Sequence, residues 1–212
     1  SRGLGDVYKR QLNDRPGNLV LKLGDSIARP LTGSDPSFPA LWREIPNSAD
    51  FVLQTDLSLD SVQRGDFIAG LIVEMQEGAA STRYVFGMED GNALRVKRSS
   101  GGAFTQLYNR VFSEGSAVIR IRREGRNLRF ERRLEPGVWT VIYSRSIPVA
   151  ATAGRGGVFA ANDSAQASRF KFDYVMLIDP SVSSPAVNHL RITELMYEPV
   201  EGGALEFIEL VN

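Results

Sequence analysis

Hydrophobic and polar residues alternate with a period of two along most of the chain between residues 18 and 178. This alternation predicts β-strands that bury one face, and turn residues separate the segments at short intervals. No stretch of ten or more residues shows a clean helical period. The expected strands are 18–23, 50–59, 67–75, 82–88, 93–98, 117–123, 127–133, 138–144, 156–162 and 169–178. The pattern therefore predicts an all-β, two-sheet antiparallel sandwich.

The same alternation assigns each side chain to a face of its sheet. In the segment 117–123, Arg120 and Arg122 take the face opposite to the isoleucines between them. A shift of one residue would bury these arginines, whereas each inward apolar side chain contributes about 1.5–3 kcal/mol. The residues that we expect to point inward are Ile119, Ile121, Leu128, Phe130, Phe170 and Phe172.

The two ends of the chain depart from this pattern. Residues 179–189 contain two prolines and three serines, which predicts a linker. Residues 190–212 contain two further strands around a turn, and because two strands cannot bury a core we expect a second domain that has been cut off. Residues 1–11 show no period and no apolar signal segment.

Composition narrows the possible functions. The chain has no cysteine, which excludes disulfides and thiolate chemistry, and no apolar run approaches the length of a membrane span. The net charge is zero, but twelve Lys or Arg and five Asp or Glu lie between Arg83 and Arg133. This asymmetry indicates either an anionic partner or an ordinary solvated sheet face. His189 is the single histidine and falls in the linker, so a Ser-His-Asp arrangement within the sandwich is excluded.

Several segments resemble those of known families. The order DFVLQTDLSL, FIAGLIVEM, YVFGM, IRIRREGRNLRFERRLEPGVWTVI and GGVFAANDSAQASRFKFDYVML resembles concanavalin A-like, laminin G-like sandwiches, found as accessory modules of bacterial extracellular proteins and at the C-terminus of some xylosidases. This resemblance implies a jelly-roll sandwich over residues 12–178. The strand of closely spaced Glu-x-Asp-x-x-Glu carboxylates that some glucanases of this fold use does not occur here.

Two shorter resemblances concern the ends. ITELMYEP and EFIELVN, within 190–212, resemble the first strands of a lamin tail domain, which is immunoglobulin-like, and this implies a large, exported bacterial protein. SRGLGDVYKRQ, at 1–11, looks like a translated sequencing adapter with a transposon end. It implies that the native chain begins near Leu12 and that the gene came from an assembled environmental sample, with any signal peptide upstream.

Candidate ligand-binding residues are aromatic and cationic. Five aromatic residues are candidates for sugar stacking, and for most of them core or rim packing is the alternative: Trp42, Tyr84, Tyr108, Trp139 and Tyr143. Four arginines could form a cationic patch for uronate or sulfate groups, and these are Arg95, Arg120, Arg122 and Arg129. The aromatic ring of Tyr84 could share their face. No cofactor is required. Calcium, common in similar sandwiches, would use Asp50 and Asp173, and surface carboxylates without metal are the alternative.

These observations favour a non-catalytic binding or spacer module, with a polysaccharide or cell-surface glycan as its partner. The alternatives are a divergent glycoside hydrolase, which needs paired carboxylates about 5–9.5 Å apart, and a structural or protein-binding domain without a glycan ligand. We expect no nucleic-acid partner. By resemblance alone, the expected location is extracellular or on the cell surface, within a polypeptide that contains further domains.

Overall fold

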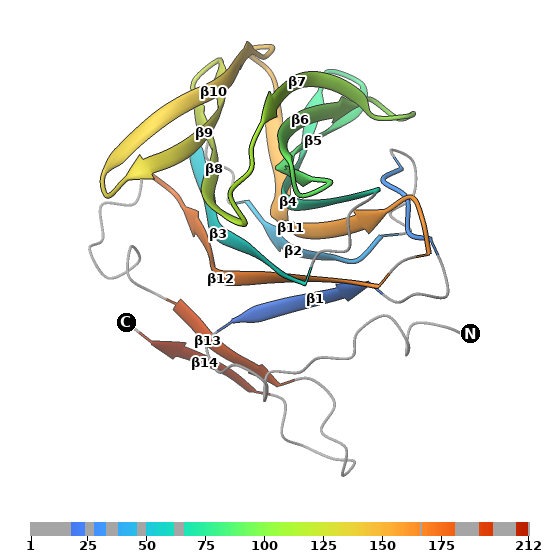
Figure 1. The fold of residues 1–212 in the computed structure, drawn as a ribbon. Coiled ribbons are helices and arrows are strands. Elements are labelled where there is room, and N and C mark those ends of the chain that lie inside the picture. The colour runs from blue at the N-terminus through green and yellow to red at the C-terminus, as the bar shows by residue number, and fades with distance from the viewer. Residues whose placement is uncertain are drawn as a thin grey trace, which may run out of the picture.

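The computed structural model describes residues 18–23, 28–32, 38–45, 50–61, 66–165, 167–180, 191–196 and 207–211. Its regular elements are β-strands, arranged as two six-stranded antiparallel sheets and one separate pair (Figure 1). The predicted all-β, two-sheet jelly-roll sandwich is confirmed. Segment 1–11 and His189 lie outside the described residues. Within the described part of the chain, no helix is long and apolar enough to cross a membrane.

The first sheet, called sheet A, places strands from both ends of the sandwich next to each other. Its spatial order is β1 (Leu19–Leu23), β12 (Ser168–Ile178), β3 (Phe51–Ser61), β8 (Ser116–Glu124), β9 (Asn127–Glu135) and β10 (Val138–Ser146). Because β12 lies between β1 and β3, Val175 is opposite Thr55 although 120 positions separate them.

The second sheet, sheet B, faces sheet A across the core. Its order is β2 (Ala40–Glu44), β11 (Thr152–Asn162), β4 (Phe67–Glu77), β5 (Ala80–Glu89), β6 (Ala93–Ser99) and β7 (Thr105–Val111). The edge strands β2 and β7 were not predicted. Most side chains of β7 are exposed, and β2 has only five residues, so neither strand has the buried apolar alternation that identifies a strand in a sequence.

The main core lies between the two sheets. All six side chains that were predicted to point inward are fully buried. Phe130 lies at an aromatic centre, with ring centroids 6.1 Å from Tyr84, 5.9 Å from Phe86 and 5.9 Å from Tyr143. Phe130 therefore packs against side chains of both sheets at the centre of the sandwich.

A second apolar cluster covers the outer face of sheet B. On β4, Leu71 and Val73 belong to the main core, whereas Ile68 and Ile72 belong to this second cluster. Since neighbouring residues of a strand point to opposite faces, the two clusters lie on opposite sides of the sheet. The second cluster contains Phe38, Ile68, Ile72, Val85, Phe159 and Ala161, with Leu31, Ala40, Trp42 and Phe104 packed against it.

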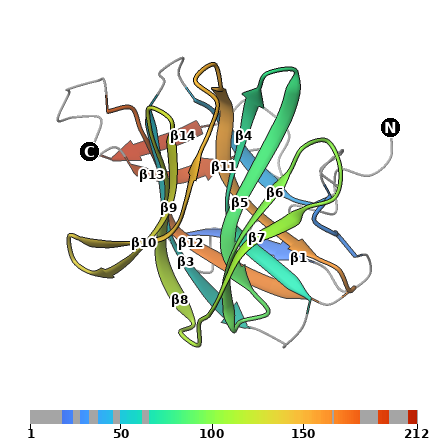
Figure 2. The ribbon, with the colours of Figure 1, turned by 90° about the horizontal axis from the view of Figure 1, so that it is seen from above.

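Strand β10 forms an irregular edge of sheet A. Figure 2 shows β9 and β10 as a hairpin at the side of the molecule. The register between them shifts twice, between Val138 and Trp139 and between Val141 and Tyr143. Val138 and Val141 remain exposed.

Beyond the sandwich, β13 (Arg191–Met196) and β14 (Phe207–Val211) form an antiparallel pair of their own. The two strands that the sequence predicted in 190–212 are thus present. Their assignment to a lamin tail domain, and the linker at 179–189, stay predictions.

Candidate functional site

The outer face of sheet A carries a row of polar and aromatic side chains, which we call the outer row. It consists of Tyr174 on β12, Gln54 on β3, Arg120 on β8, Glu131 on β9 and Trp139 on β10. The backbone register places Gln54 opposite Arg120 and Arg120 opposite Glu131. With neighbouring strands about 4.8 Å apart, the row spans about 19 Å from β12 to β10.

One end of the outer row is a stack of Trp139 on an ion pair. The Nε of Arg120 donates a hydrogen bond to Oε2 of Glu131 at 2.5 Å, and the guanidinium lies 3.9 Å from the centroid of the Trp139 ring. The Arg120 and Glu131 side chains are only 15% and 5% exposed, whereas Trp139 is half-buried. The indole therefore stacks on the guanidinium of this ion pair and keeps part of its surface in solvent.

The other end of the row is a hydrogen-bonded pair. Nε2 of Gln54 donates to the hydroxyl oxygen of Tyr174 at 2.5 Å, and the hydroxyl of Thr55 donates to the Tyr174 carbonyl at 2.5 Å. Burial raises the pKa of Tyr174, so its hydroxyl keeps the proton at neutral pH. Tyr174 can therefore donate a hydrogen bond to a ligand while it accepts one from Gln54.

Two arginines beside the outer row share one carboxylate. Arg122 on β8 lies opposite Arg129 on β9, and both form ion pairs with Glu124, that of Arg129 at 3.1 Å. Their side chains are about one third exposed. This locus has two positive charges and one negative charge, so it retains a net positive charge toward solvent.

The structure thus brings Arg120, Arg122 and Arg129 together on one face, but Arg95 lies elsewhere. Arg95 is on β6 of sheet B, where it pairs with Glu89 and donates to Gln106 at 2.6 Å. Its predicted convergence with the other arginines is wrong, because β6 pairs with β5 and β7 of the opposite sheet.

The predicted exposure of Tyr84 is also wrong. Tyr84 is fully buried in the main core, and its hydroxyl donates to Oε1 of Glu77 at 2.6 Å. Burial and this carboxylate raise its pKa to about 12. The prediction failed because Val85, its neighbour in the opposite phase, belongs to the second apolar cluster on the outer face, so that Tyr84 points inward.

The two aspartates proposed for calcium do not meet. Burial raises the pKa of the Asp56 carboxyl, and the nearby negative charge of Asp173 raises it further. Asp50 lies immediately before β3, about 20 Å from Asp56 along the strand. Its carboxylate accepts a hydrogen bond from the Gly125 amide at 2.6 Å. Asp50 and Asp173 therefore cannot share a cation, and among the described residues no group of three or more His, Cys, Asp or Glu is placed to hold a metal.

The remaining aromatic candidates have different environments. Trp42 lies on β2 with the Arg155 guanidinium 4.4 Å from its ring centroid, and Tyr108 packs against Tyr143 at 6.2 Å between centroids.

Sequence reasoning missed Gln54 and Tyr174 as site residues. The alternation of β3 could have placed Gln54 on the outer face. The position of Tyr174 could not be predicted in this way, because a register shift between Phe172 and Val175 interrupts the alternation of β12.

On the outer face of sheet B, Glu74 is held between two arginines. Nε of Arg83 donates to it at 2.8 Å, and Arg155 donates to both of its oxygens at 3.2 Å. Burial alone would raise the pKa of Glu74, but the hydrogen bonds from these arginines outweigh burial and lower it.

Glu74→Gln should reduce the acid sensitivity of the fold. A carboxyl whose pKa is lower in the folded state contributes stability above its unfolded value of 4.5, and this contribution disappears as the pH falls through the folded value. We expect the unfolding free energy to fall less between neutral and acidic pH in this variant than in the wild type. Urea unfolding at both pH values measures the difference, with Glu135→Gln at the exposed end of β9 as control. Equal acid losses in the wild type and Glu74→Gln would contradict this role.

No model of a protein family matches the sequence, and no curated protein is similar to it. Solved structures share its fold. A GH43 protein of Bacillus licheniformis has a TM-score of 0.61 at 18% identity, covering 79% of this chain and 34% of its own. A xylan β-1,4-xylosidase of Bacillus halodurans has a TM-score of 0.58 at 17% identity, covering 80% and 34%. An alginate lyase of Klebsiella pneumoniae has a TM-score of 0.51 at 12% identity, covering 77% and 82%. The chain thus spans about a third of the length of the first two proteins, and these likenesses establish the fold.

Proposed function

We propose that this chain is a non-catalytic module that binds an acidic polysaccharide across the outer face of sheet A. The observation that carries the proposal is the stack of Trp139 on Arg120, in which the indole is only partly buried at the end of the outer row. Sugar rings pack their apolar faces against aromatic rings, while planar polar side chains bind their hydroxyls.

The length and chemistry of the outer row suit an extended sugar chain. Trp139 at one end offers a stacking surface, and at the other end Tyr174, held by the buried Gln54, offers its hydroxyl group. These ends are about 19 Å apart, so a ligand that contacts both must contain several sugar units. The row therefore favours an oligosaccharide over a single ring.

The charge beside the row supports an acidic ligand. Arg122 and Arg129 share Glu124, so a sugar carboxylate or sulfate at this locus would balance the second guanidinium. Because both side chains are partly exposed, each contact is expected to be weak and to be screened by salt. Acidic sugars should accordingly bind better than neutral ones, and most strongly at low ionic strength.

The arrangement of Glu131 supports binding rather than hydrolysis. This carboxylate is tied to Arg120 and its side chain is only 5% exposed, which leaves it little access to a substrate. Glycosidases instead use two accessible carboxyl groups on opposite sides of the scissile bond. The alternative, a divergent glycoside hydrolase, is tested by incubation with the best-bound oligosaccharide. Release of new reducing ends would replace the binding proposal by the catalytic one.

The setting that we propose is extracellular or on the cell surface, within a longer polypeptide. The fold is shared with proteins named as GH43 glycoside hydrolases and as an alginate lyase, which supports a role near polysaccharides. No glycan partner more specific than an acidic polysaccharide is implied by the outer row.

Trp139→Ala should weaken binding of acidic oligosaccharides about tenfold, because loss of a stacking surface costs roughly 1–1.5 kcal/mol. The double change Arg122→Ala with Arg129→Ala should abolish the preference for acidic over neutral glycans and remove the salt dependence. A glycan array identifies the ligand, and calorimetry at low and high salt measures the affinities. Trp42→Ala, on sheet B, is the matched control and should bind as the wild type does. Equal binding of neutral and acidic glycans by the wild type would refute the acidic preference.

A further inference from the structure

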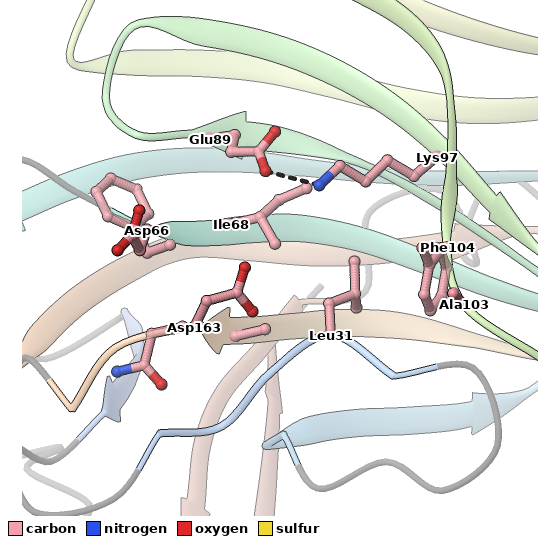
Figure 3. Close-up of a pocket in the computed structure, with 11 residues that line it drawn as sticks. Leu31, Asp66, Ile68, Glu89, Lys97, Ala103, Phe104 and Asp163 are labelled. Atoms are coloured by element: carbon pink, nitrogen blue, oxygen red, sulfur yellow. Dashed lines mark hydrogen bonds and ion pairs between the residues drawn. The ribbon is translucent and has the colours of Figure 1, made fainter.

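A cavity of about 210 Å³ lies at one end of the outer face of sheet B (Figure 3). It is on the opposite side of the sandwich from the outer row, and none of the outer-row residues lines it. Its volume is below the roughly 300–1,000 Å³ of sites for drug-sized ligands, so it suits a ligand of about one ring.

One end of the cavity is acidic. Asp66 immediately precedes β4 and Asp163 immediately follows β11, and the Asp163 amide donates to the Asp66 carbonyl at 2.8 Å. Figure 3 shows both side chains at the same end of the cavity, with the Asp163 carboxylate directed into it. Both residues are exposed, and within the described residues neither carboxylate belongs to an ion pair, so their negative charges are available to a ligand.

The opposite end is apolar. Phe104, Leu31 and Ile68 line it, and all three belong to the second apolar cluster or pack against it. Figure 3 places Phe104 and Leu31 away from Asp66, with Ile68 between the two ends. A small ring can therefore pack against Phe104 while a polar substituent reaches the acidic end.

The wall between the two ends carries one carboxylate and two cations. Nζ of Lys97 lies 2.6 Å from Oε1 of Glu89, and Arg95 forms an ion pair with the other oxygen of Glu89. Glu89 is therefore already matched by two cations and adds no attraction for a ligand cation. This trio keeps one net positive charge, and because Asp66 and Asp163 together carry two negative charges, the cavity as a whole remains net negative, with its negative charge at the acidic end.

We infer that this cavity binds an amino sugar, with its ammonium group between Asp66 and Asp163 and its ring against Phe104 and Ile68. The ring hydroxyls can donate hydrogen bonds to the same carboxylates. An acidic sugar would be repelled by the two aspartates, so the cavity selects a ligand of opposite charge from that of the outer row.

Titration by NMR with D-glucosamine, D-glucose and D-glucuronate tests this assignment. Glucosamine should shift amide resonances around Ile68 and Phe104 and bind in the cavity about fivefold more tightly than glucose, while glucuronate should leave these resonances unchanged. Equal affinities for glucosamine and glucose, or no shift with glucosamine, would overturn the proposal.

Variants locate the site. Asp66→Asn with Asp163→Asn should weaken glucosamine binding about fivefold or more. Asparagine is suited to position 66, whose φ is 55°, because it tolerates this left-handed conformation well. Asp173→Asn, an exposed carboxylate on sheet A, is the matched control. Trp139→Ala should leave glucosamine binding unchanged, which separates this site from the outer row. Unchanged binding in the double variant would remove the aspartates from the site, and thermal unfolding of each variant verifies its fold.

Discussion

Replacing Phe130 with alanine should lower the free energy of unfolding by about 3–5 kcal/mol. Phe130 is fully buried and packs against Tyr84 and Phe86 of sheet B and Tyr143 of its own sheet. These rings are large and are held by two sheets, so they cannot collapse into the space that the phenyl ring leaves. The cost is therefore the lost burial together with a cavity at the centre of the sandwich.

Equilibrium urea unfolding measures this loss. Val149→Ala is the control, because Val149 is 74% exposed and its truncation should change stability by less than about 0.5 kcal/mol. Phe130→Leu should fall between the alanine variant and the wild type, since it restores part of the volume. A loss of less than about 1 kcal/mol in Phe130→Ala would show that the two sheets do not pack through this ring.

Gly70→Ala should destabilise the protein by about 3 kcal/mol, although it adds a single methyl group. A Cβ at Gly70 would lie 2.2 Å from the Phe86 carbonyl oxygen and 2.5 Å from the Cα of Gly87. Both atoms belong to the backbone of β5, which pairs with β4 in the middle of sheet B. Because backbone cannot rotate out of the way as a side chain can, the two strands would have to separate locally.

Gly115→Ala is the matched control, since a Cβ there meets nothing within 4 Å. It should leave stability unchanged or raise it slightly, because alanine restricts the unfolded chain more than glycine does. Thermal unfolding of the two variants, side by side, gives the comparison. Equal stabilities of Gly70→Ala and Gly115→Ala would mean that β4 and β5 are less closely apposed than the structure has them.

The sequence predicts sheet A better than sheet B, because the two sheets differ in how far their outer faces are exposed to solvent. In β8 the outward-facing residues are only partly buried, so the buried Ile119 and Ile121 alternate with Arg120 and Arg122, and a shift of one residue would bury both of these arginines. In β5 both faces are buried, because the second apolar cluster covers the outer one. Alternation then carries no information about which face is the core, and Tyr84 was assigned to the wrong one.

Only part of the candidate site could be predicted from local pattern. The pairing of Arg122 with Arg129 follows from a hairpin, whose strands are adjacent in the sequence. The contact of Gln54 with Tyr174 depends on β3 pairing with β12, 120 residues further along. The sheet to which Arg95 belongs depends equally on long-range pairing. Hydrophobic periodicity and turn residues determine neither the Gln54–Tyr174 contact nor the sheet of Arg95, since the order of strands in a jelly roll depends on the whole chain.

The two register shifts in β10 have a consequence for solubility. An edge strand presents unpaired backbone N–H and C=O groups, and the exposed Val138 and Val141 would make a regular β10 a template for edge-to-edge aggregation. Each bulge interrupts the straight row of hydrogen-bonding groups and increases the local twist, so a strand from another molecule cannot pair along the full length of β10. The irregular hairpin thus keeps an apolar edge in water without allowing the sheet to extend from one molecule to the next.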